Sequence, residues 1–168
     1  MIRYFIERAI RKKNVDREKT NHFPRLGDVN TIVILFNALD MRHIQKIKTA
    51  LQKNGKQVIL WGINYTDISF GHSQSTIIDH SELSFWGFPD KRYQTEFEDL
   101  EADILVDMTR EYSPALTLLM VSNRKIPVRI AFEGKKELLY DVICKISCEE
   151  HIDLMFKELL STFQTWEH

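Results

Sequence analysis

Short apolar runs alternate with longer amphipathic stretches along most of the chain. The runs lie at residues 31–36, 57–63, 76–79, 103–108, 127–132 and 138–145. The first of them, TIVILF, is rich in β-branched residues, which is typical of a parallel strand buried on both faces. We therefore predict six strands in the spatial order third, second, first, fourth, fifth and sixth. The first and fourth are expected to be adjacent, parallel and central.

The stretches between these runs carry apolar residues at helical spacing, together with signals for helix ends. Asp40 can cap a helix that Gly55 ends, and Ser113 followed by Pro114 starts another. Ser-Cys-Glu-Glu at residues 147–150 has the form of a capping box before a last helix. A further helix is marked by Tyr93, Phe97 and Leu100. This alternation predicts a three-layer Rossmann-like α/β fold with a mostly parallel central sheet.

The first 28 residues have a different character. Apolar residues share one face of a predicted helix over residues 1–13, and basic side chains fill much of the remainder. The apolar positions are Ile2, Phe5, Ile6, Ala9 and Ile10. We predict a basic helical arm and connector at 1–28 and an α/β domain at 29–168. The apolar face of the arm is expected to meet the domain, a second copy or another partner.

Composition and charge narrow the class of protein. With 43% hydrophobic residues, the 168-residue chain can bury one core without metal or disulfides. A net charge of −1 offers no global attraction to nucleic acid. The two cysteines, Cys144 and Cys148, suit a reducing compartment. Because no apolar run nears the roughly 20 residues of a membrane span and no signal peptide is visible, we expect a cytoplasmic protein.

Common cofactor motifs are missing from the sequence. The turn at residues 37–40 lacks the G-x-G-x-x-G pattern of dinucleotide binding, and no G-x-x-x-x-G-K-S/T loop is present. The six histidines are scattered without the spacing of a zinc site. We therefore assign no cofactor and no metal.

Two pairs of titratable residues have both a functional and a structural interpretation. Cys148 near a helix N-terminus could be a reactive thiol with His151 as base, although the neighbouring glutamates oppose a thiolate. Asp103 and Asp107 could work as an acid–base pair, or could begin a strand and bind nearby backbone groups. We favour the structural interpretation for both pairs.

The segment Phe-Trp-Gly-Phe-Pro at residues 85–89 concentrates aromatic side chains. Phe85, Trp86 and Phe88 could form a platform on which a planar ligand stacks. A structural lid packed over one edge of the sheet is the interpretation we favour.

Two segments carry a resemblance to known families. DILVDMT at 103–109, followed by an apolar helix and RKIPVRIAF at 124–132, resembles the strand unit that ends the N-terminal half of heptosyltransferase-like glycosyltransferases. With the basic N-terminal helix and the 85–89 segment, the whole order resembles an uncharacterised bacterial family, a domain of unknown function. The resemblance implies the fold. Those glycosyltransferases hold their sugar nucleotide in a second Rossmann-like half. The elements predicted here account for one such half, so we do not expect a complete glycosyltransferase.

Any small ligand is expected at the carboxyl ends of the strands, between the turns at 37–40 and 109–113. The start of the helix after Ser113, together with Arg110, favours an anionic ligand. The candidate binding residues are Asn37, Asp40, Thr109, Arg110, Tyr112 and Ser113. In the structural alternative, Ser113 only caps its helix, Arg110 pairs with Asp40 or Glu111, and side chains close the crevice.

Three functions remain open from sequence. We favour a noncatalytic binding or interaction module. The second is a small enzyme or binding protein for an anionic, phosphorylated or sugar-like metabolite. The third is a peripheral factor whose arm contacts a membrane surface, a nucleic acid or another protein.

Overall fold

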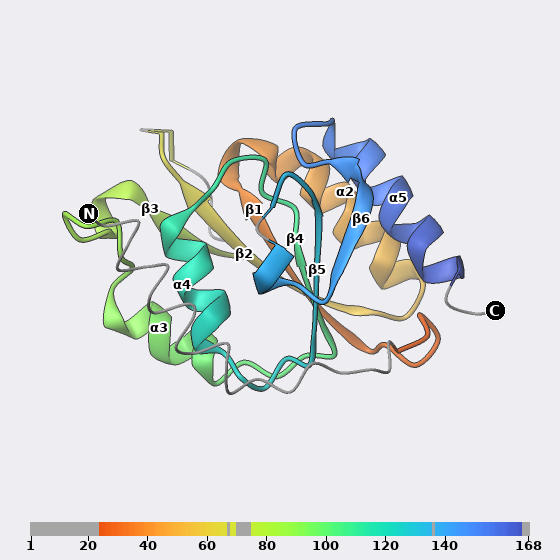
Figure 1. Cartoon of the computed structure of the whole chain (residues 1–168). Coiled ribbons are helices and arrows are strands. Elements are labelled where there is room, and N and C mark those ends of the chain that lie inside the picture. The colour runs from red at the N-terminus through yellow and green to blue at the C-terminus, as the bar shows by residue number, and fades with distance from the viewer. Residues whose placement is uncertain (1–23, 67, 70–74, 136, 166–168) are drawn as a thin grey trace.

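A six-stranded parallel sheet forms the centre of the computed structural model, which describes residues 24–66, 68–69, 75–135 and 137–165. Helices cover both faces of this sheet (Figure 1). The strand order is β3-β2-β1-β4-β5-β6, and every neighbouring pair is parallel. The predicted three-layer Rossmann-like fold and strand order are confirmed. The predicted helix of the arm lies outside the described residues, and the division at residue 28 stays a prediction.

The elements have the following bounds. The strands are β1 (Thr31–Asn37), β2 (Gln57–Asn64), β3 (Thr76–Asp79), β4 (Ile104–Asp107), β5 (Val128–Glu133) and β6 (Val142–Ser147). The α-helices are α2 (Met41–Lys53), α3 (Lys91–Glu98), α4 (Pro114–Ser122) and α5 (Ile152–Thr165). The 3-10 helices are η1 (Ala38–Asp40), η2 (His80–Glu82) and η3 (Glu137–Leu139).

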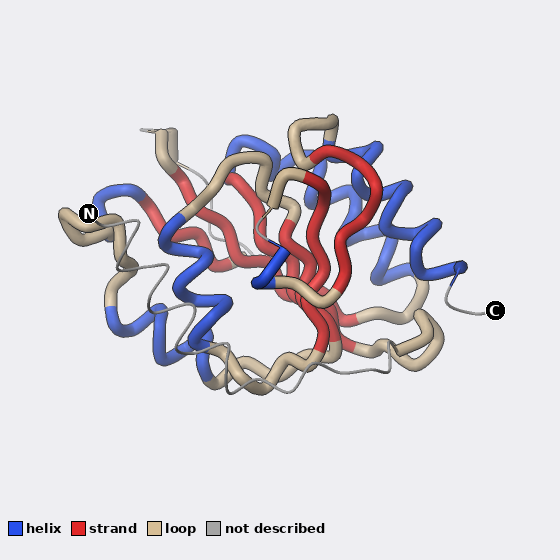
Figure 2. Tube along the Cα trace, in the orientation of Figure 1, coloured by secondary structure: helices blue, strands red, loops and turns tan. Residues whose placement is uncertain are grey.

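Strand β1 lies between β2 and β4 and sends side chains into both apolar layers. Ile32 and Ile34 belong to the layer under α2 and α5, whereas Val33 and Leu35 belong to the layer under α3 and α4. All four are at most 1% exposed, as a strand covered on both faces requires. Figure 2 shows the two helical layers on either side of the strands. The prediction that the first and fourth strands are adjacent, parallel and central is confirmed.

Several local signals act as predicted. Gly55, at a φ of 75°, ends α2, and Ser113 caps α4 by accepting from the Leu116 N–H at 3.3 Å. Asp103 directly precedes β4, and its carboxylate accepts from the backbone N–H of Asn30 and Thr31 at 2.7 and 2.8 Å. The structural interpretation of Asp103 is therefore correct.

Other local predictions are wrong. Strand β6 begins at Val142 rather than 138, because residues 137–139 form η3. The predicted capping box at 147–150 does not start α5, because β6 continues to Ser147 and the helix begins only at Ile152. Asp40 makes no side-chain cap on α2, because its carboxylate binds Arg110 instead.

The aromatic segment at 85–89 forms a tight turn. Leu83, before the segment, pairs with Pro89 in an antiparallel bridge that closes the turn, and Gly87 has a φ of 74° that favours glycine. Phe88 packs against the apolar layer under α3 and α4. Phe85 and Trp86 are 93% and 52% exposed, so the predicted lid is confined to Phe88.

A polar cluster joins η2 to α3 and creates a pH dependence. The hydroxyl of Tyr93, a side chain only 8% exposed, donates to Glu82 at 2.8 Å, and Arg92 also binds that carboxylate. Burial and the Glu82 carboxylate raise the pKa of Tyr93 to about 12. The unfolded chain releases this proton near pH 10, so the folded state binds the proton more tightly between the two values.

We therefore expect a loss of stability with rising pH that depends on Tyr93. The contribution of Tyr93 is fully present below about pH 10 and is lost as the pH rises through its folded pKa, by up to about 2 kcal/mol. Urea unfolding of wild type and Tyr93→Phe between pH 8 and 12 measures this slope. Tyr112→Phe, at a 43% exposed position, is the control. Equal slopes in wild type and Tyr93→Phe would contradict the assignment.

Candidate functional site

The carboxyl ends of β1 and β4 lie side by side where the chain leaves them toward opposite faces. Helix α2 follows β1 and covers one apolar layer, whereas α4 follows β4 and covers the other (Figure 1). A crevice for ligands is expected at such a divergence in an open parallel sheet. The structure brings together at this edge the predicted site residues of both turns.

The two turns are tied to each other by Arg110. Its backbone N–H donates to Asn37 Oδ1 at 3.1 Å, and its guanidinium binds both oxygens of Asp40 at 2.8 and 3.3 Å. The pairing of Arg110 with Asp40, which was the structural alternative, is therefore present. Because the Arg110 side chain stays 43% exposed, it can still reach a ligand from this position.

The hydroxyl of Ser113 also makes hydrogen bonds within the protein. Besides capping α4, its hydroxyl lies 2.9 Å from the hydroxyl of Tyr65, whose pKa is raised by burial. Tyr112 lies beside it and is 43% exposed. Of these two predicted site residues, Tyr112 is thus the more open to an incoming ligand.

A first pocket, of about 390 Å³, lies beyond β1 and β2. Asn37, Leu39, Asn64, Thr66 and Arg110 are among the residues that line it. Asn64 fixes neighbouring residues of this pocket. The Asn64 amide donates to Asp79 Oδ1 at 2.7 Å, and the Asn64 side-chain oxygen accepts from the hydroxyl and N–H of Thr66.

A second pocket, of about 480 Å³, lies between β4, α4 and the segment after β5. Its polar part combines Asp107 and Thr109 with two residues that the sequence analysis did not select, Lys135 and Tyr140. Its apolar lining includes Pro114, Leu116, Leu139 and Cys148. The volume is in the range of pockets for small molecules, which combine apolar walls with a few convergent polar groups.

The polar residues of the second pocket form one connected network. Asp107 Oδ1 accepts from the backbone N–H and hydroxyl of Thr109 at 2.9 and 2.6 Å, and Oδ2 accepts from the hydroxyl of Tyr140. The Lys135 ammonium donates to Thr109 Oγ1 at 2.5 Å and lies 3.7 Å from Asp107 Oδ2. The side chains of Lys135 and Asp107 are 8% and 10% exposed, so this charge pair is largely shielded from solvent.

Beside the charge pair, the tyrosine and the cysteine of this pocket keep their protons. Burial and the adjacent Asp107 carboxylate raise the pKa of Tyr140 well above its ordinary value. Burial also raises the pKa of the Cys148 thiol, although Lys135 opposes this shift. Cys148 precedes α5 by several residues and its thiol donates to the Arg110 carbonyl at 3.6 Å. These features support the structural interpretation of Cys148 over that of a thiol activated by a helix N-terminus.

Residues 2–164 match the family of unknown function DUF6913. The chain belongs to this family. Membership in DUF6913 confirms the predicted assignment to a domain of unknown function and spans both the predicted arm and the α/β domain. No curated protein and no solved structure matches the chain. The predicted likeness to heptosyltransferase-like glycosyltransferases, and a bacterial source, therefore have no support from the comparisons.

None of the helices in the described ranges combines the length and the apolar character that crossing a membrane requires.

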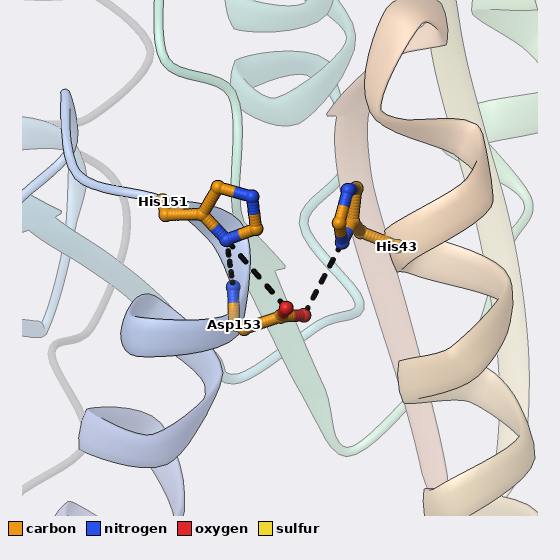
Figure 3. A group of neighbouring side chains, drawn as sticks. All are labelled: His43, His151 and Asp153. Atoms are coloured by element: carbon orange, nitrogen blue, oxygen red, sulfur yellow. Dashed lines mark hydrogen bonds and ion pairs between the residues drawn. The ribbon is translucent and has the colours of Figure 1, made fainter.

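One cluster in this DUF6913 chain was invisible to motif analysis. His43 on α2 lies beside His151 and Asp153 at the start of α5 (Figure 3). Nitrogen and oxygen atoms of the three side chains lie within 4.8 Å of one another. Because His43 is more than a hundred positions from the other two, no local spacing signals this group, and only the packing of α2 on α5 could reveal it.

Proposed function

We propose that this protein is a noncatalytic binding module that holds a small, hydroxyl-rich, anionic metabolite, of the sugar phosphate type, in the second pocket. The observation that carries this proposal is the network of Asp107, Thr109, Lys135 and Tyr140 within a pocket of about 480 Å³. Buried polar groups that converge in an otherwise apolar pocket favour ligand binding.

Hydroxyl groups of a sugar suit this network because each can both donate and accept. A carboxylate such as Asp107 accepts hydrogen bonds from them, and an ammonium such as Lys135 donates to them. The exposed ring of Tyr112, which also lines the pocket, offers an apolar surface for a sugar face. These features support the sugar-like part of the ligand.

An acidic group on the ligand suits the two cations that line the pocket. Both Lys135 and Arg110 line the pocket, and each already has a carboxylate partner. Their charges are therefore largely balanced, which favours one anionic group on the ligand over a highly charged ligand. Charge-assisted hydrogen bonds from either cation would strengthen its binding.

The protonation states support binding rather than catalysis. A tyrosine and a cysteine with raised pKa values stay protonated near neutral pH, so Tyr140 and Cys148 supply neither a base nor a thiolate. Thr109 donates to Asp107 and accepts from Lys135, which gives it a fixed place between two charges. Such a network orients a ligand without exchanging protons with it.

Titration of the protein with ribose 5-phosphate, ribose and inorganic phosphate, followed by ligand-observed NMR and calorimetry, tests the proposal. We expect ribose 5-phosphate to bind best, because only this compound offers both hydroxyls and a phosphate. Lys135→Met should weaken its binding at least about tenfold, since a charge-assisted contact contributes at least roughly 1.4 kcal/mol.

The matched control is Leu39→Ala in the first pocket, at a residue 61% exposed. This variant should bind as wild type does. If Lys135→Met binds as tightly as wild type, or if none of the three compounds binds, the proposal fails. A binding loss in Leu39→Ala alone would assign the ligand to the first pocket and would likewise overturn it.

A further inference from the structure

We infer that His43, His151 and Asp153 form a binding site for a divalent transition-metal ion, with zinc as the best match. The site lies between the first turns of α2 and α5, apart from the pocket proposed above for a metabolite. It therefore does not depend on that function.

The fold places these three residues at one point. His43 is in the first turn of α2, His151 directly precedes α5, and Asp153 is the second residue of α5. The two helices pack next to each other on one face of the sheet (Figure 1). In Figure 3 the rings of His43 and His151 both approach the carboxylate of Asp153, which lies between them.

The contacts between the side chains are longer than good hydrogen bonds and close to the spacing of ligand atoms around one ion. His43 Nδ1 is 3.4 Å from Asp153 Oδ1, and His151 Nδ1 is 3.6 Å from Asp153 Oδ2. A good N–H···O bond measures about 2.7–3.2 Å. Tetrahedral zinc with bonds of about 2.0–2.2 Å to nitrogen and oxygen holds its ligand atoms roughly 3.4 Å apart. The donor atoms of all three side chains lie within 4.8 Å of one another, so side-chain rotations would bring them onto one ion.

The set of donors selects the class of metal. Two imidazoles with one carboxylate suit Zn²⁺, Co²⁺ and Ni²⁺, whereas Mg²⁺ and Ca²⁺ prefer oxygen ligands alone. The side chains of His43, Asp153 and His151 are 30%, 51% and 56% exposed, so an ion can enter from solvent and keep water in a fourth position.

Two local features set the expected affinity. His151 Nδ1 accepts from the Asp153 backbone N–H at 3.3 Å, which assigns an unprotonated nitrogen to this position, as a metal ligand must be. That hydrogen bond is long and therefore weak, so replacing it with a bond to the metal costs little free energy. The dipoles of α2 and α5 oppose a cation at their N-termini, and the Asp153 carboxylate counters them. We expect micromolar rather than nanomolar binding.

Calorimetric titration of the chelator-treated full chain with ZnCl₂ tests this site. We expect binding that His43→Ala and Asp153→Asn each weaken at least tenfold. Neither substitution removes the His151 bond to the α5 backbone. Co²⁺ provides a second measurement, because its visible absorption reports on the geometry of its ligands, and the same two variants should lose that spectrum.

The matched control is His80→Ala, which removes an exposed histidine on η2, outside this group. It should bind Zn²⁺ as wild type does, and so should Lys135→Met from the second pocket. Circular dichroism establishes that each variant is folded. Zn²⁺ should also raise the melting temperature of wild type but not of His43→Ala, since the ion bridges two helices of the folded state only. Unchanged Zn²⁺ affinity in folded His43→Ala and Asp153→Asn, or an equal loss in His80→Ala, would overturn the inference.

Discussion

Replacing Asn123 with alanine is expected to lower the free energy of unfolding by about 3 kcal/mol. Its side chain, on a residue 1% exposed, makes four hydrogen bonds to backbone groups. The amide nitrogen donates to the carbonyls of Phe97 and Leu100 at 2.7 and 2.8 Å. The oxygen accepts from the N–H groups of Lys125 and Ile126 at 2.8 and 3.0 Å. Alanine would leave all four groups without this partner, at about 1 kcal/mol or slightly less for each.

The position of Asn123 explains why this one side chain matters. It directly follows α4, and its bonds join the end of α3 to the segment that leads into β5. These bonds thereby fix the position of α3 relative to α4, the two helices that cover the same face of the sheet. Loss of these bonds should therefore weaken the packing of the whole layer that faces the second pocket.

Urea unfolding of three variants measures this effect. Asn123→Asp keeps an acceptor for the two N–H groups but sets a buried carboxylate oxygen against the carbonyls of Phe97 and Leu100, so it should lose at least as much stability as Asn123→Ala. Asn54→Ala is the control, because Asn54 also donates to a backbone carbonyl, at 2.9 Å, but at an exposed helix end. We expect a change below about 1 kcal/mol there. An Asn123→Ala protein as stable as Asn54→Ala would contradict the argument.

The order of the sheet was predictable because burial on both faces constrains composition. The run at residues 32–36 has no polar position, which favours a central strand, and the right-handed crossovers then order its neighbours. Gly55 and Ser113 act through local backbone geometry, which depends on adjacent residues alone. Such features are readable from sequence because their causes are local.

The end of the chain was less predictable because its boundaries depend on strand pairing. The pairing of β6 with β5 shifts after Phe132, so that Glu133 lies opposite Ser147. This irregularity keeps Ser147 in the strand and delays the start of α5 to Ile152. The local sequence resembled a capping box, but cross-strand pairing, which involves β5, determined the outcome.

In the candidate site, too, contacts between distant segments could not be read from local sequence. Sequence placed Asn37, Asp40 and Arg110 at one edge, because the carboxyl ends of parallel strands meet there. It could not decide that Arg110 would bind Asp40, and it did not select Lys135. Lys135 follows β5, the strand next to β4, so the same rule applied to this turn would have found it. The partners of His43 depend on helix packing, which no local pattern describes.

Replacing Asp107 with asparagine is expected to lower the free energy of unfolding by about 3 kcal/mol, because it removes the counter-charge of a shielded lysine. The amide can still accept from Thr109, so the loss arises at Lys135 and Tyr140. Lys135 would retain its bond to Thr109 but lie, at 8% side-chain exposure, without a carboxylate beside it. Breaking one side of a buried pair is worse than removing both sides, because an uncompensated charge remains.

The double variant Asp107→Asn with Lys135→Met separates these contributions. It removes the second charge as well, so it should recover at least about 1 kcal/mol of the stability lost in Asp107→Asn, although it lacks one more polar group. Urea unfolding of wild type, both single variants and the double variant gives the coupling energy directly. If the double variant loses the sum of the two single losses, Asp107 and Lys135 are not coupled. Asp107 and Lys135 would then act as independent charges in the second pocket, and their pairing would not help to orient a ligand.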